Sequence, residues 1–197
     1  YEMMDMGEDF FWKFNKQEHY YTLPTEETIY NKNEALKNIQ LCVSEAVYKR
    51  VEATDRPVAC LLSGGLDSSL VTALVSKSYK GVLETYSIGF KGSEDLKYAK
   101  IVADYIGSKH TNIEVTEQDF LDAIPEVIRV IESYDTTTVR ASVGNYLVGK
   151  YIKEHSNAKV IFNGDGSDEV AGGYLYLHKA PNSQEFDIEC RRLVNNI

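Results

Sequence analysis

Apolar and polar residues alternate at helical spacing between residues 34 and 51. The apolar positions are Leu36, Ile39, Val43, Val47 and Val51. A period of three to four residues predicts an amphipathic helix with one buried face. The next apolar run, residues 58–62, is short and continuous and follows Pro57. Such a run is typical of a strand that is buried on both faces of a sheet.

Helix and strand patterns then take turns along the chain. We expect a helix from Ser68 to about Lys77, strands over residues 83–90 and 111–115, and between these strands a helix over 94–106 that Gly107 ends. Helices over 141–154 and 183–194 flank a fourth strand over 159–163, and the last helix should turn Phe186 and Leu193 inward.

One helix in this series has a clear beginning and an uncertain middle. Thr116, with Asp119 three residues later, predicts a helix N-cap. Pro125 either kinks this helix or opens a new one that runs to about Ser133, because proline is tolerated in a first turn but not deep inside a helix.

Strands that alternate with helices predict an α/β fold, an open parallel sheet with helices on both faces. In such sheets ligands bind beyond the carboxyl ends of the strands, where the winding direction reverses. Two polar, glycine-bearing segments, 63–69 and 164–169, directly follow the first and the fourth strand. If these two strands are neighbours, the two segments face each other across one crevice.

Composition narrows the function classes. The chain has 197 residues, of which 43% are hydrophobic and 26% charged, values that fit one folded domain with an appendage. A net charge of −9 argues against a nucleic-acid partner, because phosphate contacts need clustered Lys and Arg. The sequence has no apolar run of the roughly 18 residues that a membrane span needs. We therefore expect no membrane partner and a cytoplasmic location.

The segment Ser63-Gly64-Gly65-Leu66-Asp67-Ser68-Ser69 lies between a buried strand and a helix. Its glycines allow successive amides and the helix N-terminus to surround a phosphate. It lacks the lysine of the common nucleotide P-loop. Asp67 by itself would repel a bound phosphate. Its presence in a phosphate-binding loop is explained if it holds a magnesium ion that bridges to the phosphates. The alternative is a plain glycine turn capped by Asp67 and Ser68.

This segment resembles the loop of the PP-loop ATP pyrophosphatases, a superfamily that cleaves ATP between its α and β phosphates. Further segments are similar to the synthetase domain of the asparagine synthetase family. They are residues 86–90, 92–96, 131–142, 164–170, 172–174 and 178–181. The resemblance extends over most of residues 34–197. It implies ATP-dependent conversion of aspartate to asparagine through β-aspartyl-AMP, with release of AMP and pyrophosphate.

The resemblance also implies roles for individual residues. Adenosine would contact Leu61, Leu62 and Ile88, and the pyrophosphate with its metal would bind Ser63, Gly64, Gly65, Asp67 and Ser68. The α-phosphate would lie near Asn163 and Gly164, aspartate would be oriented by Thr137, Thr138 and Arg140, and magnesium would be held by Asp67 and Asp168. Physically, the planar guanidinium of Arg140 suits a carboxylate, although an ordinary surface ion pair is the alternative.

Two positions depart from the family pattern. Asp165 stands where the family usually has a catalytic glutamate, and Asn163 stands where serine is common. Aspartate keeps the charge but has a reach shorter by roughly 1 Å, which alters a proton-transfer geometry unless the loop compensates. A related enzyme such as a β-lactam synthetase, or a non-catalytic ATP-binding module, therefore stays open.

The resemblance divides the chain in two. Residues 1–30 look like the tail of a preceding glutaminase-like domain or a linker, with two short extended pieces near residues 10–15 and 19–23. Residues 31–197 correspond to the synthetase domain, which in the family continues further at its C-terminal side. The implied cofactors are ATP and Mg²⁺, the implied partners are aspartate and ammonia from a glutaminase domain, and a homodimer is open. Cys42, Cys60 and Cys190 have no metal-site spacing and predict free thiols.

Overall fold

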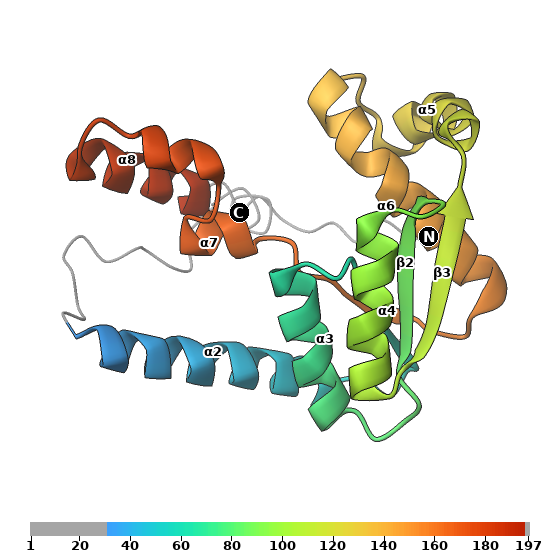
Figure 1. Cartoon of the computed structure of the whole chain (residues 1–197), viewed down its shortest axis with the longest axis horizontal. Helices are drawn as coiled ribbons and strands as arrows, with labels where there is room; N and C mark the ends of the chain where they lie inside the picture. The colour runs from blue at the N-terminus through green and yellow to red at the C-terminus, as the bar shows by residue number, and fades with distance from the viewer. Residues whose placement is uncertain (1–30, 196–197) are drawn as a thin grey trace, which may run out of the picture. The chain divides into compact units, whose positions relative to one another are not determined.

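A four-stranded parallel sheet organises the chain in the computed structural model, which describes residues 31–195 (Figure 1). The strand order is β3-β2-β1-β4, with bounds Val58–Leu61 for β1, Glu84–Phe90 for β2, Lys109–Val115 for β3 and Val160–Phe162 for β4. The register pairs Cys60 of β1 with Thr85 of β2 on one side and with Phe162 of β4 on the other. The predicted parallel sheet is confirmed, and the first and fourth strands are neighbours, which is the condition under which the two polar segments were expected to face each other.

The chain divides into two compact units, residues 1–36 and 37–197. Of the first unit the structure describes residues 31–36, which include the start of helix α2, Lys32–Glu52. The pieces expected near residues 10–15 and 19–23 lie outside the described residues. None of the helices in the described part is long and apolar enough to cross a membrane.

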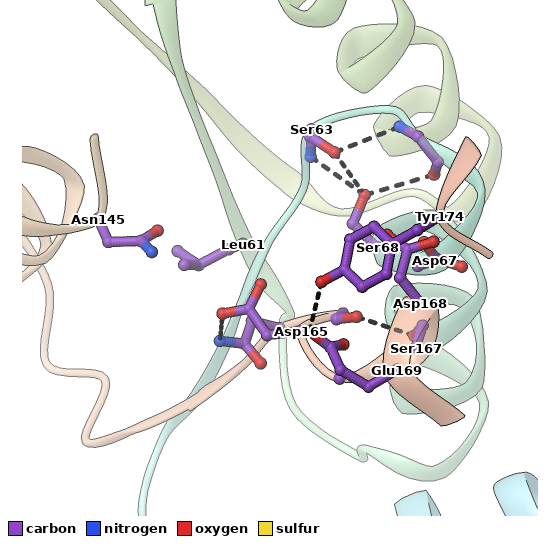
Figure 2. A pocket seen from close by; sticks show the side chains of 14 residues that line it. Leu61, Ser63, Asp67, Ser68, Asn145, Asp165, Ser167, Asp168, Glu169 and Tyr174 are labelled. Atoms are coloured by element: carbon purple, nitrogen blue, oxygen red, sulfur yellow. Dashed lines mark hydrogen bonds between the residues drawn. The ribbon is translucent and has the colours of Figure 1, made fainter. Parts of the chain in front are cut away.

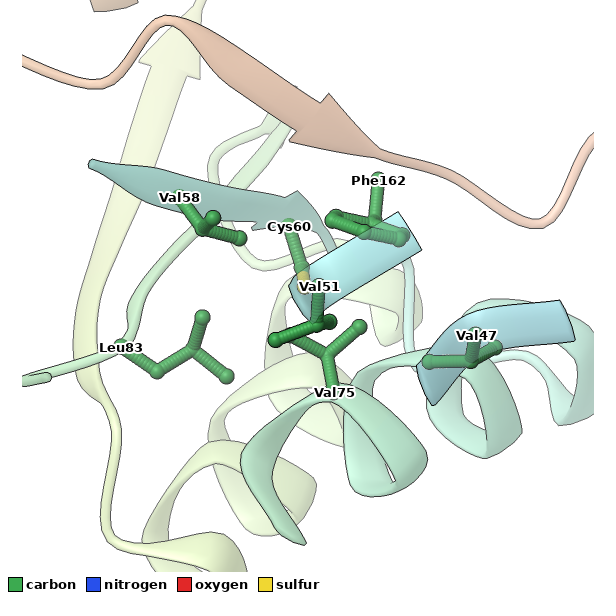
Figure 3. Packing of buried hydrophobic residues seen from close by; sticks show 7 residues of the cluster. All are labelled: Val47, Val51, Val58, Cys60, Val75, Leu83 and Phe162. Carbon is green, nitrogen blue, oxygen red and sulfur yellow. The ribbon is translucent and has the colours of Figure 1, made fainter. Parts of the chain in front are cut away.

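Helices cover both faces of the sheet, and the alternation of side chains along β1 decides which core each residue enters. Val58 and Cys60 point to the face where Val47 and Val51 of α2 and Val75 of α3, Leu66–Ser78, pack (Figure 3). Leu62 continues this face and packs against Ala99 and Ala103 of α4, Glu94–Ile106. Ala59 points the other way and joins Val148 and Ile152 of α6, Thr136–His155.

The α4 side of the sheet also buries polar groups. Thr85 and Ser87 of β2 are almost fully buried beside His110 and Asn112 of β3. The His110 ring lies between the Thr85 hydroxyl, 2.9 Å from Nδ1, and the Asn112 side-chain oxygen, 2.7 Å from Nε2. Burial lowers the pKa of His110, so the neutral ring is favoured and its hydrogen bonds satisfy the neighbouring groups.

Helix ends follow the local signals in the sequence. Thr116 and Asp119 form a reciprocal capping box at the start of α5, Glu117–Ile131, and Gly107 ends α4 with a φ of 70°. The prediction of a new helix at Pro125 is wrong, because α5 is one helix that runs through this residue. Ala123 and Val127, on either side of the proline, are buried against α6, and this packing holds the helix together there.

Helix α6 begins five positions before the expected Ala141. Asp135 is its N-cap, and the Asp135 carboxylate accepts hydrogen bonds from the Thr138 amide at 2.8 Å and from the Thr138 hydroxyl at 2.9 Å. Thr137, Thr138 and Arg140 therefore lie in the first turns of a helix.

The C-terminal part contains elements that the sequence pattern did not predict. A short helix α7, Ser167–Ala171, and a 3-10 helix, Leu175–Lys179, precede α8, Ser183–Asn195. Helix α8 has no buried side chain, and 40% of Phe186 is exposed. The expected inward face is formed in part: a Cβ added to Gly172 at the end of α7 would lie 3.6 Å from the Phe186 ring, and Leu193 is half-buried.

Candidate functional site

The first loop of the site connects β1 to α3. Gly64 has a φ of +83°, and a Cβ added there would lie 2.5 Å from the backbone nitrogen of Ala99 in α4. Only glycine fits such a position without a shift of the backbone. The loop thus lies directly on α4, and its course from Ser63 to the start of α3 at Leu66 is fixed by this contact.

Two serine hydroxyls close the first loop. The Ser68 hydroxyl accepts from the Ser63 amide at 3.2 Å and lies 2.9 Å from the Ser63 hydroxyl, which in turn accepts from the Gly65 amide at 3.3 Å (Figure 2). These hydrogen bonds hold the Ser63 and Ser68 hydroxyls close together at the start of α3. Amides in the first turn of a helix lack intrahelical acceptors, so this end of α3 is suited to a phosphate.

The second loop follows β4. Its Asn163 side chain donates to Asp165 Oδ2 at 2.7 Å, and the Ser167 hydroxyl donates to the Gly164 carbonyl at 2.8 Å. A Cβ added to Gly164 would lie 2.8 Å from the Ser68 backbone nitrogen. The second loop therefore touches the first one at the N-terminal turn of α3, as the expected crevice between the first and fourth strands requires.

The two loops enclose one cavity of about 400 Å³, within the range of small-molecule sites. Its lining residues are Leu61, Ser63, Gly65, Asp67, Ser68, Asn145, Asn163, Gly164, Asp165, Gly166, Ser167, Asp168, Glu169 and Tyr174. This cavity brings together most of the residues to which the sequence gave a nucleotide or metal role.

Four carboxylates line this cavity, and their partners divide them. Glu169 accepts a hydrogen bond from the Tyr174 hydroxyl, which raises the pKa of Tyr174 to about 12 and lowers the pKa of Glu169. Asp165 is held by Asn163. Within the described residues, Asp67 and Asp168 have no hydrogen bond or ion pair to their carboxylates. These two are free to bind a cation.

The described residues contain no group of three or more His, Cys, Asp or Glu side chains that could hold a metal by themselves. Mg²⁺ is usually bound through one or two carboxylates together with water and substrate phosphates. The pair Asp67 and Asp168 fits that donor set, with the remaining oxygens coming from a nucleotide.

Other predicted site residues lie outside this cavity. The Leu62 side chain is buried against α4, and Ile88 packs against the core cluster on the α6 side. Gly64 lies in the first loop on the side that contacts α4. Leu62 contributes its amide to the sheet, where it donates to the Tyr86 carbonyl at 2.8 Å. The adenosine contacts that the resemblance implied are thus represented in the cavity wall by Leu61.

The residues that were predicted to orient the substrate aspartate also lie outside this cavity. Arg140 lines a second, largely apolar cavity of about 460 Å³ between α5 and α6, with Phe120, Leu121, Ile124, Ile128, Tyr134, Thr136, Val139 and Val143. Thr137 and Thr138 line neither cavity. In the described part of the chain Arg140 has no ion pair, so its expected alternative as a surface salt bridge is also not realised.

Sequence reasoning gave no role to several lining residues. Gly166, Ser167 and Glu169 belong to the second glycine-bearing loop, so their position after the fourth strand was a usable signal. Tyr174 lies in the segment 172–174 that resembles the family, but no role was given to it. Asn145 had no such signal, because it lies in the middle of α6.

Comparisons with known proteins agree with this geometry. The family model for asparagine synthase matches residues 38–193. The glutamine-hydrolysing asparagine synthetases of Homo sapiens and Gallus gallus are each 46% identical over 165 residues, which is 81% of this chain and 29% of the relative. The chain thus spans less than a third of the length of the curated relatives it matches.

Solved structures show the fold. A glutamine-dependent NAD⁺ synthetase from Acinetobacter baumannii, solved with ADP, matches with a TM-score of 0.52 at 18% identity. The match covers 78% of this chain and 29% of the synthetase chain. A tRNA thiolase from Methanococcus maripaludis matches with a TM-score of 0.52 at 16% identity, over 79% of this chain and 54% of the thiolase chain. What the chain shares with both structures is the fold, an open parallel sheet with helices on both faces. With a family model that matches residues 38–193, the chain belongs to the asparagine synthase family.

Proposed function

We propose that this chain performs the ATP-dependent step in which the side-chain carboxylate of aspartate becomes the amide of asparagine. One observation carries the proposal: the two glycine-bearing loops meet at Gly164 and Ser68 and enclose one polar cavity. Membership in the asparagine synthase family supports the choice of aspartate among carboxylic acids.

The first loop and the free carboxylates would receive the polyphosphate. The Ser63 and Ser68 hydroxyls, with the amides at the start of α3, would bind the pyrophosphate portion of ATP. Asp67 and Asp168 would hold Mg²⁺, which supplies charge neutralisation to the phosphates when it is bound. Because the chain carries a net charge of −9, its overall electrostatic potential repels the polyphosphate of ATP. The backbone amides of the loop must therefore provide the local attraction.

The reaction has two balanced steps. An oxygen of the aspartate β-carboxylate attacks the α-phosphorus, the bond to the bridging oxygen breaks, and β-aspartyl-AMP and pyrophosphate form. Ammonia then attacks the acyl carbon, AMP leaves with the electrons of the acyl–oxygen bond, and the nitrogen loses one proton. The protein contributes by placing the reacting groups and stabilising the developing charge.

Asp165 is the proposed acceptor of the proton that the attacking nitrogen loses. It lines the cavity, and Asn163 occupies its Oδ2, so the carboxylate has a fixed orientation and a second oxygen for this purpose.

The proposal extends to partners and location. The matched relatives are named as glutamine-hydrolysing, so we assign the ammonia to glutamine hydrolysed by a glutaminase domain. We further propose a cytoplasmic protein that acts on small molecules as a homodimer. Analytical ultracentrifugation at micromolar concentration tests the dimer, and a single monomeric species would exclude it.

The test of the proposed activity uses the chain with ATP, MgCl₂, ammonium chloride and a panel of carboxylic acids. We expect AMP, pyrophosphate and asparagine in equal amounts with L-aspartate, and no AMP when the acid is omitted. Release of pyrophosphate with another acid but not with aspartate would instead indicate a related acyl-adenylate enzyme, such as one of β-lactam synthetase type.

A second candidate, a nucleotide-binding module without catalysis, is favoured by the position of Arg140. This arginine lines the apolar cavity between α5 and α6 and not the cavity of the two loops. Calorimetry that shows Mg·ATP binding, combined with the absence of AMP in the turnover assay, would support this candidate over the enzyme.

A further inference from the structure

Helix α6 contributes one residue, Asn145, to the wall of the cavity between the two loops. Figure 2 shows Asn145 beyond Leu61, on the side of the cavity away from Ser63 and Ser68. Its side-chain amide forms no hydrogen bond within the described part of the chain. An amide that faces a polar cavity with both its donor and its acceptor free is suited to a ligand that offers both.

The position of Asn145 on α6 follows from helix geometry. Positions 138, 142 and 145 are spaced i, i+4 and i+7, so Thr138, Ser142 and Asn145 share one face of the helix. Two turns further along nearly the same face, Ile152 is buried against the sheet. This face therefore packs on the sheet in its C-terminal half and passes over the strand ends in its N-terminal half.

The opposite end of α6 is fixed to the base of the sheet. Ser156, which follows the last turn, donates a hydrogen bond to Glu84 at the start of β2. The helix thus runs antiparallel to the strands, and Asn145 lies at the level of their carboxyl ends. Val139 and Val143 lie on a different face and pack against α5, which is also why Arg140 points to the apolar cavity.

We propose that Asn145 binds the acid substrate and determines which acid the site accepts. The ligand class is an α-amino acid with a second carboxylate: Nδ2 of Asn145 donates to its α-carboxylate, and Oδ1 accepts from its ammonium group. Because the phosphates would occupy the serine side, the reacting carboxylate lies between Asn145 and the α-phosphorus. This assignment rests on the proposed function and names the residue that selects its substrate.

The first experiment compares N145A and N145D with K150A. Lys150 is an exposed residue on the same helix that lines neither cavity, so K150A controls for changes in α6. For N145A we expect the KM for L-aspartate to rise roughly 10- to 100-fold, the range for losing a hydrogen bond to a charged group. The KM for ATP should stay within about twofold, since neutral truncation leaves the serine loop intact. N145D should raise the KM for aspartate further by repulsion of the carboxylate.

A second readout does not depend on turnover. The side-chain amide resonances of Asn145 are assigned by their loss in N145D, in a ¹⁵N spectrum of the chain with Mg²⁺ and α,β-methylene-ATP. We expect them to shift when L-aspartate is added, in wild type and K150A alike. Resonances that stay in place, whatever acid is added, overturn the inference even if asparagine is formed.

The two proposals can fail separately. A shift of the Asn145 amide with glutamate or another amino dicarboxylate, but not with aspartate, would support the inference and refute aspartate as the substrate. Turnover of aspartate with an unchanged KM in N145A would support the proposed function and refute the role of Asn145.

Discussion

Gly64 offers a sharp test of how the first loop is built. Replacement by alanine puts a non-glycine residue at a φ of +83°, which costs roughly 1–2 kcal/mol. The added Cβ would also lie 2.5 Å from the Ala99 nitrogen and 2.6 Å from the Tyr98 Cβ. Overpacking against a fixed backbone costs about 1–3 kcal/mol more. We therefore expect G64A to lose about 2–5 kcal/mol of the free energy of unfolding.

Gly65 provides the matched control. It has an extended backbone, φ −68° and ψ 167°, and a Cβ there would lie 3.4 Å from the Ser63 hydroxyl. Alanine fits this conformation, and the loss as an N-cap is offset by the lower entropy of the unfolded chain. We expect G65A to remain within about 1 kcal/mol of wild type.

The assay is urea unfolding followed by circular dichroism, with thermal unfolding as a second measurement. At this chain length a loss of 2–5 kcal/mol corresponds to a fall in Tm of roughly 4–20 °C. Mg·ATP affinity, measured by calorimetry on the folded fraction, should fall in G64A because the loop must move away from α4. Equal stability of G64A and G65A would refute the conclusion that the loop is fixed by its contact with α4.

Three further predictions concern charges and thiols. The hydrogen bond from Ser156 lowers the pKa of Glu84, although burial partly opposes this effect. The ionised Glu84 side chain therefore stabilises the fold above the unfolded pKa near 4.5, and this stabilisation is lost as pH falls through the folded pKa. In urea unfolding, E84Q should be about 1–2 kcal/mol less stable than wild type at pH 7 and approach it near pH 3. Burial raises the pKa of the Cys60 thiol to about 12, so iodoacetamide at pH 8 should label exposed Cys42 readily and Cys60 only after unfolding, as mass spectrometry of peptides will show. D168N should leave Tm unchanged within about 2 °C and abolish the Mg²⁺ dependence of ATP binding, whereas an unchanged dependence would remove this residue from the metal site.

Local chemistry made much of the fold predictable from the sequence. The Thr116 capping box and the Gly107 helix end depend on residues a few positions apart, and both lie where the sequence placed them. The apolar run of β1 indicated a strand buried on both faces, whereas its position beside β4 was only a condition in the sequence analysis and is given by the structure.

Features that depend on tertiary packing were harder to predict. The continuity of α5 through Pro125 depends on burial of Ala123 and Val127 against α6, which no local rule for proline contains. The face that Arg140 occupies depends on where α5 packs, so its place in the cavity between α5 and α6 could not be predicted from the motif alone. Asn145 reaches that cavity because α6 crosses the strand ends, a relation between segments distant in sequence.

The central place of β1 has a consequence for folding. The walls of the cavity between the two loops come from the segments after β1 and after β4, the last strand in the described residues, so neither loop is complete as a site without the other. Long-range parallel pairing of this kind forms slowly compared with helices. Binding of a fluorescent ATP analogue during refolding should therefore lag behind the recovery of the circular dichroism signal of the helices. The rate of ligand binding would then report when β4 pairs with β1.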